Sequence, residues 1–564
     1  MPYDLATVRV PRLRGRALRL FTGLAERPLL GLPLRLQMMR SLGVSRFRAA
    51  DPGTASPLPE PPAAPAGESG PGPEPGELAS RALATPAAAA PGFAFPSVAD
   101  YREAYAAGRT SPSEVAGATL EFLEREAGEP LAINPLLAWR REEVLRQASE
   151  SEERLRRGEP RGAFEGVPVV VKDEMDLAGF PMTLGTRFLG ARPAATEDAT
   201  CVARLRAAGA VILGKANMHE LGIGVTGLNP HHGPARNPWN PERATGGSSS
   251  GSAASVAAGL APVALGCDGG GSVRIPASLC GVVGLKPTYG RISEHGVAPL
   301  CWSVAHVGPL AATARDAALA YAAVAGPDPR DPLGRGQPAV DLEGLGRTDL
   351  AGLVLGIFPP WFEDAEPGVV AACRRVLDGL VAAGAELREV EVPELDLTRL
   401  VHAVTIALEI AASQQAWYDE HRTDYGHDIR LNLLLARHLG GVDYVHAARL
   451  RARIRAHWAR LFDEVDAVVS PSTGCTAPPL DPAALATGDS DLGLLDRIMR
   501  FAPAANLAGF PAISIPAGED AAGLPVGFQV MARPWQEALL LSIAHLAEGF
   551  VERGRPRVWR SPLG

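Results

Sequence analysis

Lysine is nearly absent from this sequence. Of its 55 basic residues only three are lysine, namely Lys172, Lys215 and Lys286. Arginine keeps its proton in proteins, whereas a buried lysine can lose its proton and act as a base. Lys172 ends the apolar segment 166–172, GVPVVVK, which predicts a buried strand. A lysine at a strand end is commonly a surface residue whose ammonium group lies in water. Its retention in a chain so poor in lysine favours a chemical role instead.

Cysteine motifs and long hydrophobic runs are also missing. The six cysteines are scattered and none forms a Cys-x-x-Cys pair, which argues against a zinc site and against a disulfide framework. The longest uncharged apolar run near the start, residues 28–34, is too short for a secretory signal and far too short for a membrane span. We therefore expect a reducing, cytoplasmic setting, and we expect no metal and no cofactor.

Acidic residues outnumber basic ones overall, but basic residues are concentrated at the start of the chain. The net charge of −8 gives no support to nucleic acid as a partner. Residues 1–50 hold ten arginines against Asp4 and Glu26, which leaves a charge of −16 for the rest. Segment 12–48 predicts two short basic amphipathic helices separated by Pro28 and Pro33. Such helices pack on the protein body or on a second subunit, or they lie on a membrane surface.

Composition divides the chain into an N-terminal extension (1–50), a linker (51–92) and a main domain (93–564). The linker has 17 Pro or Gly among its 42 residues and no periodicity, so we expect it to be disordered or extended. In the main domain, strands alternate with helices, which predicts an α/β fold with a central twisted mixed sheet flanked by helices. The expected strands are 166–173, 210–213, 281–285, 353–357, 386–392, 466–471, 511–516 and 526–531, and the expected helices include 113–126, 200–208, 367–383, 396–420, 440–463, 499–509 and 537–551.

Two clusters of small residues, GGSSSGS at 246–252 and DGGGS at 268–272, stand out in this domain. Glycine and serine clusters are typical of flexible linkers. Here a helix-like run (253–259) and a strand-like run (262–266) separate the clusters, and a linker has no need of core-forming elements. Glycines beside serines, bracketed by buried elements, instead indicate backbone N–H groups arranged around a nucleophile.

Ser272 is the expected nucleophile, because Gly269, Gly270 and Gly271 precede it and their N–H groups can stabilise an oxyanion. A serine hydroxyl needs a base. None of the twelve histidines lies in a recognisable motif, so we expect Lys172, neutral because burial disfavours its charge, to act as the base. A relay hydroxyl from the first cluster would join the two groups. Such an arrangement returns the proton to a leaving amine, which amide cleavage requires.

The segments VKD at Lys172, GGSSSGSAA at 246–254 and DGGGSVRIP at 268–276 resemble the amidase signature family over about residues 97–556. The resemblance implies that Lys172 is the base, Ser248 the relay serine after a cis peptide bond, and Ser272 the acyl-accepting nucleophile. It also implies that Gly269, Gly270 and Gly271 bind the oxyanion. In one position the sequence departs from the pattern, because Cys267 stands where the family usually has threonine.

Within this family the chain is most similar to the plant-type fatty acid amide hydrolases. The similarity includes LGKANMHELGIG at 213–224, MRFAPAANLAGFPAISIP at 499–516 and the extension itself. It implies hydrolysis of N-acylethanolamines and related lipid amides, an acyl channel lined by Gly222 and its neighbours, a homodimer, and peripheral membrane contact through 12–48. Two alternatives stay open: an amidase of the same mechanism acting on small, aryl or peptide amides, and a partner-dependent amidotransferase A-type subunit. The intact Lys172, Ser248 and Ser272 argue against a non-catalytic protein.

Overall fold

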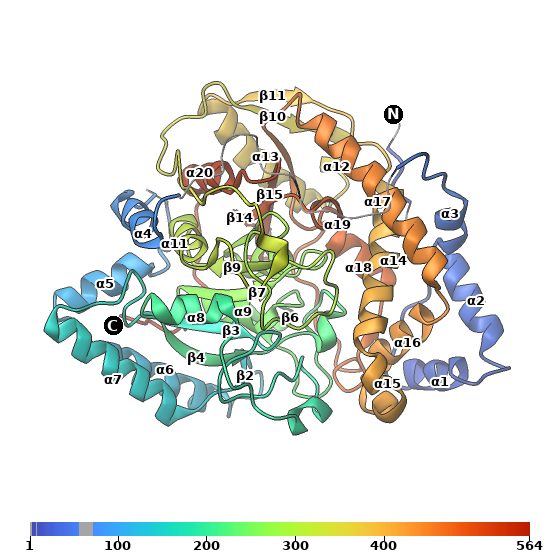
Figure 1. Cartoon of the computed structure of the whole chain (residues 1–564), viewed down its shortest axis with the longest axis horizontal. Coiled ribbons are helices and arrows are strands. Elements are labelled where there is room, and N and C mark those ends of the chain that lie inside the picture. Colours follow the sequence, from blue (N-terminus) through green and yellow to red (C-terminus); the bar gives the residue numbers. More distant parts are fainter. Residues whose placement is uncertain are drawn as a thin grey trace.

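In the part of the chain that the structure describes, eleven strands form one mixed sheet at the centre of the molecule (Figure 1). The computed structural model describes residues 3–6, 8, 10–55, 62, 72–88 and 90–563. The order across the sheet is β11 (Glu386–Glu389), β10 (Val354–Ile357), β12 (Ala467–Pro471), β15 (Pro525–Ala532), β14 (Ala512–Glu519), β8 (Val283–Lys286), β9 (Val307–Ala311), β7 (Val263–Cys267), β3 (Pro168–Lys172), β4 (Val211–Ala216) and β2 (Leu136–Ala138).

Strand β3 is buried on both faces of the sheet, which explains its continuous run of apolar residues. It pairs in parallel with both β4 and β7, so it lies inside the sheet and all five of its residues are buried. Val169 and Val171 pack into the core on one face, and Val170 packs into the core on the other. A strand covered on both faces is expected to be continuously apolar. The fold therefore places Lys172 at the carboxyl end of a central strand.

Helices cover both faces of the sheet. One face packs against α8 (Thr200–Ala207), α11 (Ala314–Val324), α13 (Pro367–Ala382) and α20 (Glu537–Glu548). The other face packs against α6 (Pro112–Glu126), α7 (Arg141–Arg157), α9 (Ser250–Ala257), α10 (Arg274–Cys280), α14 (Leu395–Ser413), α17 (Gly441–Leu461) and α19 (Pro503–Ala508). The predicted α/β architecture is confirmed.

Shorter elements surround these layers. Within residues 93–563 the other α-helices are α5 (Val98–Ala106), α12 (Pro359–Phe362), α15 (Gln415–His421), α16 (His427–Ala436) and α18 (Leu492–Met499). The short 3₁₀ helices are η1 (Phe188–Ala191), η2 (Glu220–Gly222), η3 (Pro332–Gly334) and η4 (Arg422–Asp424). Two small ladders join β1 (Leu13–Arg14) to β13 (Asp489–Ser490) and β5 (Arg236–Asn237) to β6 (Asn240–Ala244).

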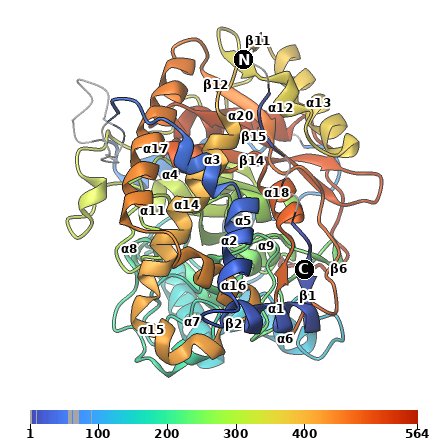
Figure 2. The same cartoon turned by 90° about the vertical axis from the view of Figure 1, so that its right-hand side faces the viewer.

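The N-terminal extension forms three helices where the sequence predicted two. They are α1 (Gly15–Ala25), α2 (Leu32–Ser41) and α3 (Val44–Ala49), and they lie along α14 and α16 (Figure 2). Gly43 separates α2 from α3 with φ +88°, a left-handed conformation that glycine adopts without steric cost. Pro33 lies in the first turn of α2, where proline is tolerated. No helix within the described ranges is long and apolar enough to cross a membrane.

Part of the expected linker is helical, which corrects the prediction that all of 51–92 is extended or disordered. Residues Pro75–Ala84 form α4, which packs on α11 and buries Leu78 and Ala82. These two side chains lie four residues apart on one helix face, and Pro75 suits the first turn. Residues 56–61, 63–71 and 89 of the linker, and residues 1–2, 7 and 9 of the extension, lie outside the described residues.

Two predicted helices are each divided in two. Residues 396–420 form α14 and α15, which meet at Gln414. Residues 499–509 form the end of α18 and all of α19. Pro503 begins the new helix, because proline has no N–H and the first turn of a helix does not need one. Both divisions matter for the site, since α14 and α18 line its cavity.

Candidate active site

Lys172 is buried next to Ser248. The Lys172 side chain is 1% exposed, and its Nζ lies 2.8 Å from Ser248 Oγ and 3.3 Å from the Cys267 carbonyl oxygen. A carboxylate oxygen of Glu174 lies 2.6 Å from the same Nζ. Lys172 is thus not a surface residue, and two of the three residues singled out for catalysis are in direct contact. Sequence reasoning missed Glu174, although it lies only two residues beyond the lysine.

Tight backbone packing holds Ser248 in this position. A cis peptide bond joins Gly247 to Ser248, as the family resemblance implies. A Cβ atom on Gly247 would lie 2.9 Å from the Gly227 backbone nitrogen, so no side chain fits there. The Ser248 carbonyl oxygen accepts a hydrogen bond from the His219 N–H at 3.1 Å. The small residues of the first cluster are therefore a packing requirement and not a sign of flexibility.

Ser272 lies beside this pair, in the loop between β7 and α10. Its carbonyl oxygen accepts a hydrogen bond from the Ser249 N–H at 3.2 Å, so the two Gly-Ser clusters are adjacent in space. No hydrogen bond between described residues joins the Ser248 and Ser272 hydroxyls. The contact between Lys172 and Ser248, the expected relay serine, is thus formed, while the contact between Ser248 and Ser272, the expected nucleophile, is not. Catalytic hydrogen bonds are often loose without substrate.

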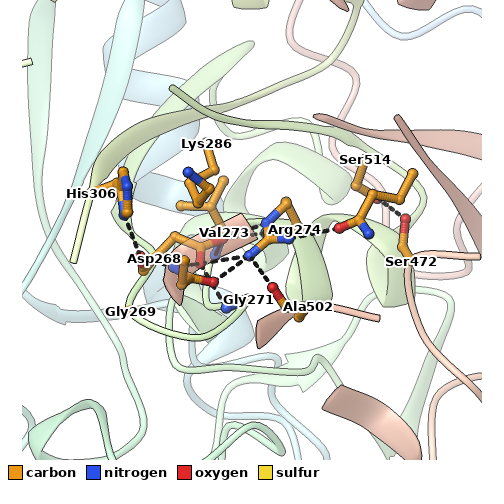
Figure 3. A network of polar contacts seen from close by, with 12 residues as sticks. Asp268, Gly269, Gly271, Val273, Arg274, Lys286, His306, Ser472, Ala502 and Ser514 are labelled. Atoms are coloured by element: carbon orange, nitrogen blue, oxygen red, sulfur yellow. Dashed lines mark hydrogen bonds and ion pairs between the residues drawn. The ribbon is translucent and has the colours of Figure 1, made fainter. Parts of the chain in front are cut away.

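A buried carboxylate, Asp268, organises the loop that holds Ser272, the expected nucleophile, and we call this loop the nucleophile loop (Figure 3). It accepts hydrogen bonds from the Gly271 N–H at 2.6 Å and from the Val273 N–H at 3.1 Å. The Arg274 guanidinium contacts both of its oxygens, at 3.0 and 3.1 Å. Burial raises the pKa of Asp268, but Arg274, Lys286 and Asn506 outweigh burial and hold that pKa below its ordinary value. The loop is thus wrapped around a permanent negative charge.

The hydrogen bonds of Asp268 reduce the number of backbone N–H groups that are available to bind an oxyanion. The Gly271 N–H is already engaged by Asp268. Among the described residues, the N–H groups of Gly269, Gly270 and Ser272 have no hydrogen-bond acceptor. Gly270 and Ser272 also line the cavity whose walls include α14 and α18. The expected role for Gly269 and Gly270 thus fits the geometry better than the expected role for Gly271.

His402 of α14 is a further site residue that sequence reasoning missed. Its Nε2 lies 2.8 Å from the Gly269 carbonyl oxygen. Burial lowers the pKa of His402 to about 4, so its ring is neutral near pH 7 and Nε2–H donates to that oxygen. In a trans peptide the C=O and N–H point in opposite directions. By holding the Gly269 carbonyl, His402 therefore aims the Gly270 N–H away from α14.

Cys267 contacts the site through its backbone. Its carbonyl oxygen is the atom near Lys172, and burial raises the pKa of its thiol well above the ordinary value. A threonine at this position would present the same carbonyl. The departure of Cys267 from the family pattern thus leaves the contact with Lys172 intact.

A cavity of about 280 Å³ adjoins Ser272 and Gly222. Its walls are mostly apolar and come from α14, α16, α18 and the turn 222–225. The extension supplies a further part of the wall, namely Leu5, Val8, Met39, Leu42, Val44 and Phe47. A Cβ atom on Gly222 would lie 3.6 Å from Ser248 Oγ, so glycine lets the turn 222–225 lie close to Ser248. Gly222 and its neighbours line this cavity, and their contact with an acyl chain stays a prediction.

Fold and site together define an amide-hydrolysing enzyme of the amidase signature family. The family model described as Amidase matches residues 118–541, which is most of the chain, and the chain belongs to this family. It is 36% identical over 578 residues to a fatty acid amide hydrolase of Oryza sativa subsp. indica, a match that covers 98% of this chain and 95% of the relative.

Other members of the family are also similar. The A subunit of the glutamyl-tRNA(Gln) amidotransferase from Carboxydothermus hydrogenoformans is 37% identical over 481 residues, covering 79% of this chain and 96% of the relative. The solved structure of a peptide amidase from Stenotrophomonas maltophilia superposes with a TM-score of 0.67 at 29% identity, covering 83% of this chain and 98% of that one.

Proposed function

We propose that this enzyme hydrolyses fatty acid amides, including N-acylethanolamines, to a fatty acid and an amine. The observation that carries the proposal is the apolar cavity beside Ser272, part of whose wall the N-terminal extension supplies. An acyl chain is apolar and gains free energy by leaving water for such a cavity. The rice fatty acid amide hydrolase matches nearly the whole chain, so the match includes most of the extension.

The proposed reaction has two halves that share one proton route. Lys172, as the base, takes a proton from the Ser248 hydroxyl, and Ser248 takes one from Ser272 as the Ser272 Oγ attacks the amide carbon. The N–H groups of Gly269 and Gly270 stabilise the oxyanion. The proton then returns through Ser248 to the amine nitrogen, the C–N bond breaks, and an acyl-enzyme forms on Ser272. Water attacks this ester along the same route, and the fatty acid is released.

The two alternatives use the same mechanism and differ in substrate. Small, aryl or peptide amides do not need a long apolar cavity. An amidotransferase subunit does not need the extension, and about a fifth of this chain lies outside its match to the Carboxydothermus relative. The apolar wall and the extension therefore favour the lipid amide.

Rates across a series of substrates test the proposal. We expect kcat/KM for N-acylethanolamines to rise as the acyl chain lengthens from acetyl to oleoyl, because each added methylene is buried in the cavity. Dipeptide amides and acetanilides provide the comparison. A flat series, or faster cleavage of the peptide or aryl amides, would contradict the lipid assignment and favour the second candidate function.

We further propose that the extension contacts a membrane surface. Its exposed leucines lie on α1, α2 and the turn between them, beside several arginines; they are Leu20, Leu24, Leu29, Leu30, Leu32 and Leu36. Apolar side chains flanked by basic ones suit an anionic bilayer surface. A second copy of this chain is the other partner we expect for the same surface.

A further inference from the structure

Part of the wall of the largely apolar cavity is polar, and four of its residues are Thr398, Arg399, Asp496 and Arg500. We call these four residues the polar strip. Thr398 and Arg399 belong to α14, Asp496 belongs to α18, and Arg500 follows α18 directly. A polar strip in a cavity for an acyl chain has no role in the proposed reaction, because the reacting groups lie around Ser272.

The strip lies close to the nucleophile loop. A Cβ atom on Gly270 would lie 2.7 Å from the ring of His402 and 3.1 Å from the Met499 side chain. His402 follows Arg399 by three residues on α14, and Met499 follows Asp496 by three residues on α18. Three residues of helix rise about 4.5 Å. The strip is therefore one helical turn from the loop, near the part of an acyl chain that adjoins the carbonyl group.

Ion pairs hold the strip in place. Asp496 lies 2.8 Å from an Arg500 nitrogen and 3.7 Å from Arg399 Nε. Arg399 also pairs with Asp396 at 2.6 Å, and Arg500 pairs with Asp364. Opposite charges alternate along these contacts. Because each arginine already has an aspartate partner, the polar strip favours a neutral ligand over a charged one.

The ion pairs leave hydrogen-bonding capacity unused. Four buried atoms of the strip have no hydrogen-bond partner in the described part of the chain: Thr398 Oγ1, Arg399 Nε, Asp496 Oδ1 and Arg500 Nε. Thr398 and Asp496 are only 2% and 4% exposed. Buried polar atoms are nearly always paired in folded proteins. Unused donors and acceptors in residues that line a cavity point to a ligand that supplies the missing partners.

The spacing of these atoms selects the ligand group. Arg399 Nε and Asp496 Oδ1 are 3.7 Å apart, too far for a direct hydrogen bond but close enough to share one bridging oxygen. A hydroxyl accepts from Arg399 Nε–H and donates its proton to Asp496 Oδ1. A carboxylate has no proton for Asp496, and a methylene satisfies neither atom. Only a group that both donates and accepts fits the pair.

We infer that the polar strip is a subsite for a hydroxyl group on the acyl chain, carried near the carbonyl end. The preferred substrates are then amides of hydroxylated fatty acids. This inference rests on the proposed function and narrows its substrate class. It needs no chemistry beyond amide hydrolysis, because the hydroxyl is bound and does not react.

Matched substrates test the subsite. Each pair of N-acylethanolamines has the same chain length and differs by one hydroxyl, placed near the carbonyl in one series and at the far end in another. We expect the wild-type enzyme to favour the proximal hydroxyl roughly tenfold in kcat/KM, the scale of a hydrogen bond to a charged group, and to show no such gain for the distal one. Equal rates for the hydroxylated and plain chains would overturn the inference.

Variants show whether the strip is responsible. Thr398→Val and Asp496→Asn change its hydrogen-bonding groups with little change of volume. We expect each variant to lower the ratio of kcat/KM for the proximally hydroxylated substrate to that for the plain substrate toward one. Thr405→Val is the matched control on α14, because the Thr405 hydroxyl already donates to the Val401 carbonyl and does not line the cavity. If Asp496→Asn does not fold, Thr398→Val decides. A preference that survives in the folded variants would overturn the assignment.

The same data separate the two proposals. If plain and hydroxylated N-acylethanolamines are both refractory while other amides are cleaved, the proposed function fails. If plain N-acylethanolamines are good substrates and a hydroxyl adds nothing, only the subsite fails.

Discussion

His402 Nε2 lies 2.8 Å from the carbonyl oxygen of Gly269, although the two residues are 133 positions apart in the sequence. This hydrogen bond ties helix α14, a wall of the cavity, to the glycine loop before Ser272. In the proposed mechanism it makes His402 a positioning residue, because it acts on the Gly270 N–H through the peptide bond.

Replacing His402 therefore affects the transition state more than substrate binding. We expect His402→Leu to lower kcat by about tenfold to a hundredfold, somewhat less than the loss of an entire oxyanion donor, with a smaller change in KM. His402→Gln places an amide N–H near the Nε2 position and is expected to restore most of kcat. Affinity for a trifluoromethyl ketone inhibitor, which mimics the oxyanion, should fall in parallel with kcat. A Leu variant with reduced thermal stability but unchanged kcat would show a purely structural role.

Ser272→Ala tests the nucleophile. The variant should lose at least roughly 10⁴-fold in kcat, as serine hydrolases do without their nucleophile, and a fluorophosphonate should no longer label it. Ser255→Ala is the matched control, because the Ser255 hydroxyl donates to Gly251 within the same cluster region. Labelling of the Ser272 variant at another serine, detected by peptide mass, would disprove the assignment.

Lys172→Arg separates a base from a mere positive charge. Arginine keeps its proton near neutral pH, so the variant has a cation beside Ser248 and Glu174 but no base. We expect activity as low as in Lys172→Met, measured as single-turnover acylation. Substantial activity in the Arg variant would mean that the positive charge, and not proton transfer, is the contribution of this residue.

Leu29→Glu combined with Leu30→Glu tests the membrane surface. These side chains are 85% and 62% exposed in the turn between α1 and α2, and the change adds two negative charges where we expect contact with lipid. Sedimentation with anionic phospholipid vesicles should show binding by the wild type and little by the double variant. Val442→Glu, at an equally exposed position on α17, should bind like the wild type.

Light scattering on the same variants tests the other expected partner. If the double variant is monomeric while a dimeric wild type ignores vesicles, the surface joins two copies of this chain.

Asp428→Asn changes how stability depends on pH. Burial and the neighbouring Glu220 raise the pKa of Asp428 to about 8, whereas an unfolded aspartate has an ordinary pKa near 3.8. The folded state thus keeps a proton that the unfolded state releases, so the stability contribution is full below pH 3.8 and is lost progressively up to about pH 8. Asparagine does not ionise.

The measurement is the difference in melting temperature between the Asn variant and the wild type. We expect it to rise from pH 5 to pH 8 in favour of the variant. Glu548 and Asp316, whose pKa values burial raises to about 7, titrate in both proteins and cancel. His219 lies 3.8 Å from Asp428, but burial lowers its pKa to about 3, so it stays neutral over this range. A constant difference would contradict the raised pKa of Asp428.

The sequence predicted the parts of the site that local pattern determines. Strand β3 was predictable because a strand buried on both faces is continuously apolar, and the two Gly-Ser clusters were predictable because close backbone approach demands small residues. His402 was not predictable, since its role exists only when α14 packs on the loop. The helix α4 was missed because the Pro and Gly content of its surroundings hides two apolar residues four positions apart.

The extension supplies part of the cavity wall, while the residues expected to react all come from the region that the family model matches. One part of the cavity wall is thus encoded outside the stretch that supplies the reacting groups, while the rest of the wall is encoded within it. Exchange of the first fifty codons between relatives would alter which chains are accepted without disturbing the catalytic apparatus. Substitutions in the extension can therefore change the shape of the cavity while the reacting groups stay in place.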